Sequence, residues 1–148
     1  MSIFTSLEVS GSALSAERQR AEVVAANMAN AETTRTPEGG PYRRKQVVFS
    51  SSPVNSFRMM LVNSGGAGAN VSTSAVRVTK VVDDPTPPIQ RYEPGNADAN
   101  AEGYVAYPNI NPVQEMADLM DSVRAYQLNA AAINASKQII TGAIDILK

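Results

Sequence analysis

The stretch that decides the fold is the C-terminal run PVQEMADLMDSVRAYQLNAAAINASKQIITGAIDILK, residues 112–148. Apolar residues recur in it at alternating steps of three and four, a spacing typical of a heptad seam, and predict one long amphipathic helix. Nine of the ten positions on this seam are apolar, and the tenth is Lys137. Asn111 is placed to cap the helix, and Pro112 suits its first turn. The seam positions are Met116, Leu119, Val123, Tyr126, Ala130, Ile133, Lys137, Ile140, Ile144 and Leu147.

The N-terminal residues 1–31 repeat the pattern less regularly. Seven of the nine positions at the same stepping are apolar. Residues 1–31 contain one glycine and no proline. This weaker seam of smaller side chains predicts a second helix that packs closely against a partner helix. The positions are Ile3, Leu7, Ser10, Leu14, Glu17, Ala21, Val24, Met28 and Ala31.

The middle of the chain differs sharply from its ends. Between residues 31 and 113 lie all nine prolines and seven of the nine glycines. Turn signals there separate short β-rich runs, which predict a small antiparallel sheet with long loops. These runs are residues 44–49, 57–62, 75–82 and 89–92.

We therefore expect a mainly α fold with a small β-rich middle. The long N- and C-terminal amphipathic helices should pair as a coiled coil, with an irregular antiparallel β segment inserted between them. The expected domains are a helical assembly domain, residues 1–31 and 112–148, and a β/loop-rich middle domain, residues 32–111.

Composition argues against catalysis. The 148 residues include no histidine and no cysteine, so a Ser-His-Asp triad, a cysteine nucleophile and a Cys/His zinc site are excluded. A carboxylate pair such as Asp98 and Glu102 is the remaining option, and a solvated loop is the simpler interpretation of it. We expect no enzyme activity, no cofactor and no metal.

Charge and hydropathy restrict the classes of partner that we expect this chain to bind. The formal net charge is -1 and the basic run Arg43-Arg44-Lys45 is short, which disfavours nucleic acid. No stretch approaches the roughly 18 apolar residues that span a bilayer, so we expect no direct membrane insertion. The N-terminal residues lack the pattern of a cleaved signal peptide.

Length favours assembly with other chains. A helix of residues 113–148 would be about 54 Å long at about 1.5 Å per residue. A compact globule of 148 residues has a diameter of roughly 40 Å. Met120, Ile139 and Ile146 widen the apolar face of the helix, and such a surface requires other chains to cover it.

Two motifs carry a family resemblance. Asn27-Met28-Ala29-Asn30-Ala31-Glu32-Thr33 resembles the N-x-A-N-x-x-T signature of bacterial flagellar rod and hook proteins. The run from Glu115 to Asn129 is similar to their terminal helix. Residues 36–45 and 103–111 resemble those of proximal-rod members in particular. The amides of Asn27 and Asn30, three residues apart on one helical face, can bond backbone or partner groups where the helix ends.

The resemblance implies a structural subunit of the proximal rod of the flagellar basal body. Such subunits polymerise through their terminal helices into a hollow axial shaft that transmits torque and passes exported subunits. The implied partners are copies of itself, other proximal-rod subunits, the distal rod and a basal adaptor. The flagellar type III apparatus would export it without a cleaved signal peptide to a periplasmic rod.

The expected assembly interface combines both seams with the motif residues. Its residues are Ile3, Leu7, Leu14, Ala21, Val24, Asn27, Met28, Asn30, Thr33, Met116, Leu119, Val123, Tyr126, Ala130, Ile133, Lys137, Ile140, Ile144 and Leu147. Lys137 either extends to the rim or pairs with an acidic group on a neighbouring subunit.

Other interpretations stay open at this point. A coiled-coil adaptor or a secretion-chaperone-like binding module would form stable helices as a free dimer, and another rod-family member would differ in the middle segment. Phe57–Leu61 resembles a short export-gate motif or is an ordinary strand. Gly65–Gly68 lacks the Lys-Ser/Thr of a phosphate loop, and Asn96–Asn100 lacks the later ligands of a calcium loop.

Overall fold

The computed structural model describes residues 3–53 and 74–146. Four sequence-based expectations lie outside the described residues. They are the strand at 57–62, the export motif Phe57–Leu61, the turn Gly65–Gly68 and the seam residue Leu147.

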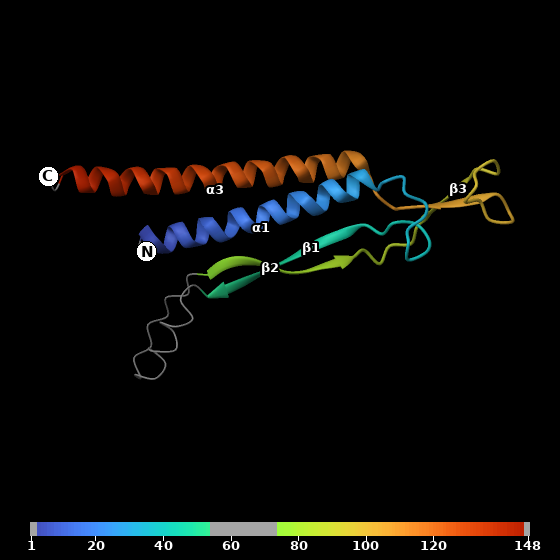
Figure 1. Ribbon diagram of the computed structural model, residues 1–148, viewed down its shortest axis with the longest axis horizontal. Helices are drawn as coiled ribbons and strands as arrows, with labels where there is room; N and C mark the ends of the chain where they lie inside the picture. The colour runs from blue at the N-terminus through green and yellow to red at the C-terminus, as the bar shows by residue number, and fades with distance from the viewer. Residues whose placement is uncertain (1–2, 54–73, 147–148) are drawn as a thin grey trace, which may run out of the picture. The chain divides into compact units, whose positions relative to one another are not determined.

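Two long helices form the two ends of the described chain, as expected. Helix α1 spans Ile3–Ala29 and helix α3 spans Pro112–Ile146 (Figure 1). They pack together in antiparallel directions, because Asn27 contacts Glu115 while the earlier residue Arg20 contacts the later residue Asp118. The prediction of paired terminal helices with small antiparallel sheets between them is confirmed.

The start of α3 follows the predicted capping chemistry. The Asn111 side-chain oxygen accepts the Val113 N–H at 3.0 Å, and its backbone oxygen accepts the Glu115 N–H at 3.0 Å. Pro112 is the first helical residue, where its missing N–H leaves no bond unmade.

The end of α1 is closed by the asparagine motif. The Asn30 N–H bonds the Ala26 carbonyl, and the Asn30 side chain donates to that same carbonyl at 2.8 Å. Thr33 then donates its hydroxyl to the Asn30 side-chain oxygen at 3.2 Å. The second asparagine of the motif therefore acts within its own helix end and stabilises the turn that follows.

Among the described residues, four strands follow α1 and precede α3 in the sequence. Strand β1 spans Lys45–Pro53 and β2 spans Ser74–Asp83, and these two form one two-stranded sheet, whose strands run in opposite directions in Figure 1. Strand β3 spans Ile89–Tyr92 and β4 spans Tyr104–Tyr107, and these form a second. The first, second and third of these strands match β-rich runs seen in the sequence, whereas β4 was not expected as a strand.

The β3–β4 pair is an antiparallel hairpin with an organised loop. Tyr92 pairs with Tyr104, and their rings meet edge to face at 5.3 Å. Gly103 precedes β4 with a φ of 82°, and a Cβ there would lie 2.9 Å from the Tyr92 ring. A glycine is required because a side chain would be strained and would collide with that ring.

The described chain divides into two compact units. Of the described residues, one unit comprises 3–18, 49–53, 74–79 and 123–146, and the other comprises 19–48 and 80–122. Among the described residues, the buried apolar side chain of the first unit is Ala16, and those of the second are Val24, Val105, Pro108 and Ile110. With so few buried apolar groups, polar contacts have an unusual share in holding the second unit together.

Candidate functional site

The large apolar side chains of α3 lie mostly on its exposed surface. Of the predicted seam, Leu119, Ala130, Ile133 and Ile140 are half-buried. Exposed residues of α3 include Met116, Met120, Val123, Tyr126, Leu128, Lys137, Ile139, Ile144 and Ile146.

The buried positions of α3 are one residue away from the predicted seam. Glu115 and Ser122, seven residues apart, are each 1% exposed, while their neighbours Met116 and Val123 are 49% and 44% exposed. The Ser122 hydroxyl donates to the Leu119 carbonyl of its own helix at 2.8 Å, so its burial leaves no polar group unpaired. Two polar residues thus occupy buried positions of α3, and the apolar residues directly beside them, Met116 and Val123, remain exposed.

The predicted interface residues of α1 are more enclosed. Ile3 is exposed, and Val24 and Asn27 are buried. The remaining ones, Leu7, Leu14, Ala21, Met28, Asn30 and Thr33, are half-buried. The structure therefore brings Asn27 into a buried contact and leaves Asn30 and Thr33 at the helix end.

Asn27 is the centre of a buried hydrogen-bond network. Its amide nitrogen donates to the Lys45 carbonyl at 2.8 Å and to Glu115 Oε2 at 3.0 Å. Its amide oxygen accepts the Lys45 N–H at 2.9 Å and the Tyr42 hydroxyl at 3.1 Å. All four hydrogen-bonding positions of the amide are filled. The side chain pairs with both backbone groups of Lys45 and thereby ties the start of β1 to α1.

Arg44 binds the other oxygen of Glu115. Its Nε donates to Glu115 Oε1 at 2.6 Å, its Nη2 lies 3.5 Å from Asp118 Oδ2 and its Nη1 lies 3.8 Å from Asp84 Oδ2. Arg20 approaches Asp118 from α1 at 3.5 Å. The guanidinium therefore joins carboxylates that follow β2 and begin α3, and its charge compensates the buried Glu115.

Tyr42 completes the network at its edge. Burial, followed by the negative charges of Asp83 and Glu115, raises the pKa of its hydroxyl above the ordinary value. The hydroxyl is therefore held in the protonated form, which it needs to donate to Asn27.

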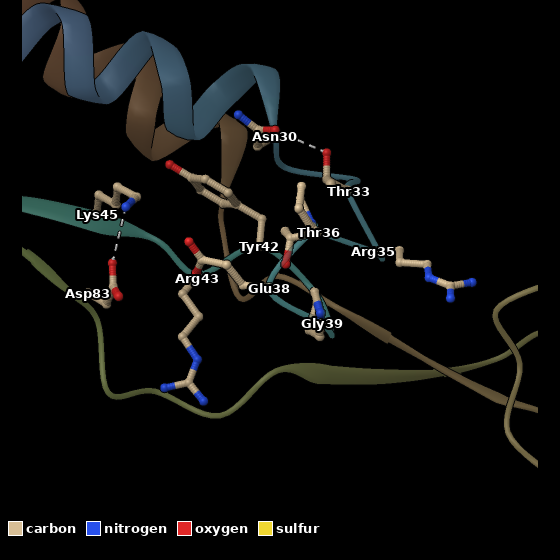
Figure 2. Close-up of a pocket in the computed structure, with 12 residues that line it drawn as sticks. Asn30, Thr33, Arg35, Thr36, Glu38, Gly39, Tyr42, Arg43, Lys45 and Asp83 are labelled. Atoms are coloured by element: carbon tan, nitrogen blue, oxygen red, sulfur yellow. Dashed lines mark hydrogen bonds and ion pairs between the residues drawn. The ribbon is translucent and has the colours of Figure 1, made fainter.

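A pocket of about 370 Å³ lies beside this network and is lined by the turn after α1 (Figure 2). Its charged groups are of both signs, and Lys45 is paired with Asp83 at 3.6 Å. Within residues 3–53 and 74–146, no group of three or more side chains could hold a metal ion. The lining residues are Asn30, Thr33, Arg35, Thr36, Pro37, Glu38, Gly39, Pro41, Tyr42, Arg43, Lys45 and Asp83.

The segment Asn96–Asn100 is an organised loop. The Asp98 carboxylate accepts the Thr34 hydroxyl at 2.7 Å and pairs with Arg35 at 3.8 Å. The Asn100 side-chain oxygen accepts the Glu102 and Tyr104 N–H groups. These oxygens thus join the loop to the turn after α1 and to β4.

Sequence reasoning found Asn27 but missed its partners. Glu115, Arg44 and Tyr42 lie inside segments that carry the family resemblance, which was the available signal. Periodicity could not identify Glu115, because an acidic residue beside an apolar seam is normally exposed.

Among residues 3–53 and 74–146, no helix combines the length and the apolar character that crossing a bilayer requires.

Comparison with known proteins places the geometry in context. Residues 7–35 match the family described as "Flagella basal body rod protein", and residues 101–146 match "Flagellar basal body rod FlgEFG protein C-terminal". Together these two segments contain the helix-end motif, Glu115 and most of both helices.

Relatives that match along nearly their whole length indicate the same family. The chain is 43% identical over 152 residues to the flagellar basal-body rod protein FlgC of Bacillus subtilis, with all of both chains covered. It is 36% identical to that of Borreliella burgdorferi, covering 100% of this chain and 99% of the relative. For Salmonella typhimurium the identity is 36%, covering 95% of this chain and 94% of the relative. This family is structural and not enzymatic, as composition led us to expect. The buried hydrogen-bond network around Asn27 and the exposed apolar residues of α3 thus belong to a member of the FlgC family of flagellar basal-body rod proteins.

Proposed function

We propose that this protein is a structural subunit of the proximal rod of the bacterial flagellar basal body. Copies polymerise through their terminal helices into a hollow helical shaft that transmits torque and passes exported subunits. The observation that carries the proposal is the arrangement of α3, whose buried residues Glu115 and Ser122 are polar while many of its large apolar side chains are exposed. Family membership supports the location.

The exposed apolar line supplies the energy of assembly. Full burial of one large apolar side chain contributes roughly 1.5–3 kcal/mol. Met116, Met120 and Val123 are 49%, 56% and 44% exposed, so about half of that contribution, roughly 1 kcal/mol each, remains for a contact with another chain. Several such residues along one helix suffice for a specific contact when many subunits act together, because each subunit is held on more than one side.

The two parts of the chain have different roles in this proposal. Residues 1–31 and 112–148 form the helical assembly domain, and all interface residues named from the sequence except Thr33 belong to it. Residues 32–111 form the middle domain, which contacts neighbouring rod proteins. Head-to-tail contacts about a rotation that does not close produce a helical tube. Its partners are other copies, other proximal-rod subunits, the distal rod and a basal adaptor.

The subunit reaches the periplasmic rod through the flagellar type III apparatus, without a cleaved signal peptide. Lys137, exposed on α3, is a candidate for pairing with an acidic group of a neighbour. Lys137→Met should leave the fold intact and disturb assembly.

Deletion of the gene tests the function. Cells that carry the deletion should be non-motile, their basal bodies should end before a completed rod in electron micrographs, and the intact gene should restore both. Motile cells with complete rods would contradict the proposal and favour an adaptor or chaperone role.

A further inference from the structure

The ion pair of Arg44 and Glu115 is placed where three parts of one compact unit meet. Glu115 belongs to the first turn of α3, Arg44 immediately precedes β1, and Asn27 in the last turns of α1 contacts the same carboxylate. The Glu115 side chain is 1% exposed and that of Arg44 is 22% exposed. A charged pair therefore occupies a position that apolar side chains fill in most proteins.

Stability alone does not account for such a pair. Removing a carboxylate from water is costly, and the attraction to a guanidinium roughly balances that cost. Apolar or neutral side chains of similar volume are often equally stabilising at such positions. Glu115 also has a second buried partner, Asn27, so both of its oxygens are used in directed bonds.

What this arrangement adds is a fixed relative orientation of the segments that it joins. Apolar side chains pack in several related registers, whereas a guanidinium fork and a carboxamide bind along fixed lines. Arg44 reaches Glu115, Asp118 and Asp84 at once, and these lie on one helix and after one strand. Rotating α3 by one residue about its axis would break the contacts with both Glu115 and Asp118.

We propose that the Arg44–Glu115 pair is a register pin, which holds the start of α3 and the start of β1 in one orientation on the end of α1. Its role is to present the outward residues Met116 and Met120 in a single direction to the neighbouring subunit. Arg44 and Glu115 are positioning residues in this sense. The assembly part of this inference rests on the proposed function.

The test removes both charges together in the full chain. Arg44→Met combined with Glu115→Gln keeps side-chain lengths, and glutamine retains an oxygen for Asn27. The control is Lys45→Met with Asp83→Asn, which removes an adjacent pair whose side chains are 47% and 57% exposed. Both double variants should melt within about 4 °C of the parent chain. A Tm drop well beyond that in the Arg44/Glu115 variant would overturn the proposal, because the pair would then serve stability.

Orientation is measured directly with spin labels, independently of any flagellar role. The chain has no cysteine, so Ala25→Cys on α1 and Asp121→Cys on α3, both exposed, give a pair of specific labels within one unit. The distribution of distances between the two labels, measured by pulsed electron paramagnetic resonance, should be narrow in the parent and the control. It should broaden or become bimodal in the Arg44/Glu115 variant. An unchanged width in a folded variant would overturn the pin.

Assembly is then measured in cells. In the deletion strain, the control should restore motility, and the Arg44/Glu115 variant should restore at least about tenfold fewer motile cells. Full motility with a broadened distance distribution would contradict the assembly role alone. Motility in the deletion strain itself would instead contradict the proposed function, and the spin-label result would still decide the pin.

Discussion

Replacing Asn27 with alanine is the sharpest test of how this fold is held together. The substitution removes four hydrogen bonds, two of them to the backbone of Lys45 and one to the buried carboxylate of Glu115. At about 1 kcal/mol for each bond, the free energy of unfolding should fall by roughly 4 kcal/mol. The loss of a partner at Glu115 weighs most, because a buried charged oxygen has no water to replace it.

The matched control is Asn30→Ala in the same motif. Asn30 is half-buried, and within the described residues its side chain bonds Ala26 and Thr33, both at its own helix end. Its loss should lower the free energy of unfolding by about 1 kcal/mol or less.

Thermal unfolding followed by circular dichroism measures both variants. For a chain of this size, roughly 2–4 °C corresponds to 1 kcal/mol, so Asn27→Ala should lower the Tm by roughly 8–16 °C and Asn30→Ala by under about 4 °C. Hydrogen exchange should show that the Lys45 amide loses its protection in Asn27→Ala alone. Similar small shifts in the two variants would refute the buried network as a main source of stability.

Three further predictions follow from the same structure. Met120→Ser should change the unfolding free energy of the free chain by less than about 0.5 kcal/mol, since Met120 is exposed, yet should reduce motility in a complementation assay. Gly103→Ala should lower stability by about 1–2 kcal/mol from the backbone alone, and more as Tyr92 is displaced, which a urea melt measures. The hydrogen bonds from Asn96 and then Tyr107 hold the pKa of Glu93 below its ordinary value. This contribution to stability is present above the unfolded pKa and is lost as pH falls through the folded one. Asn96→Ala should therefore raise the Glu93 pKa in an NMR titration, and an unchanged value would contradict this origin.

Local sequence patterns predicted most of the helices and strands. The three-and-four spacing predicted α3 to within a few residues, and Asn111 and Pro112 marked its start. Alternation and turn residues found β1, β2 and β3, because period-two patterns and proline breaks act within a few residues of chain. Strand β4 was missed because four residues bounded by Gly103 and Pro108 carry too little pattern of their own; its partner β3 makes it a strand.

Which residues of α3 turn inward was not readable from periodicity. The seam of α3 was correct as an apolar line, yet Glu115 and Ser122, one position away, are the buried residues. A heptad pattern shows that apolar groups share a face, and it contains no information about whether that face meets its own chain or another. That choice depends on which partner surface the folded chain offers.

Residue identity in this sequence thus determined the helices, their caps, most strands and the exclusion of histidine and cysteine chemistry, because these depend on neighbours close in the chain. Tertiary structure alone decided that Asn27 and Glu115, 88 residues apart, share a hydrogen bond, and that Arg44 compensates the buried carboxylate. A buried charge is stable only when distant segments bring its partners together, and those segments meet only in the folded molecule.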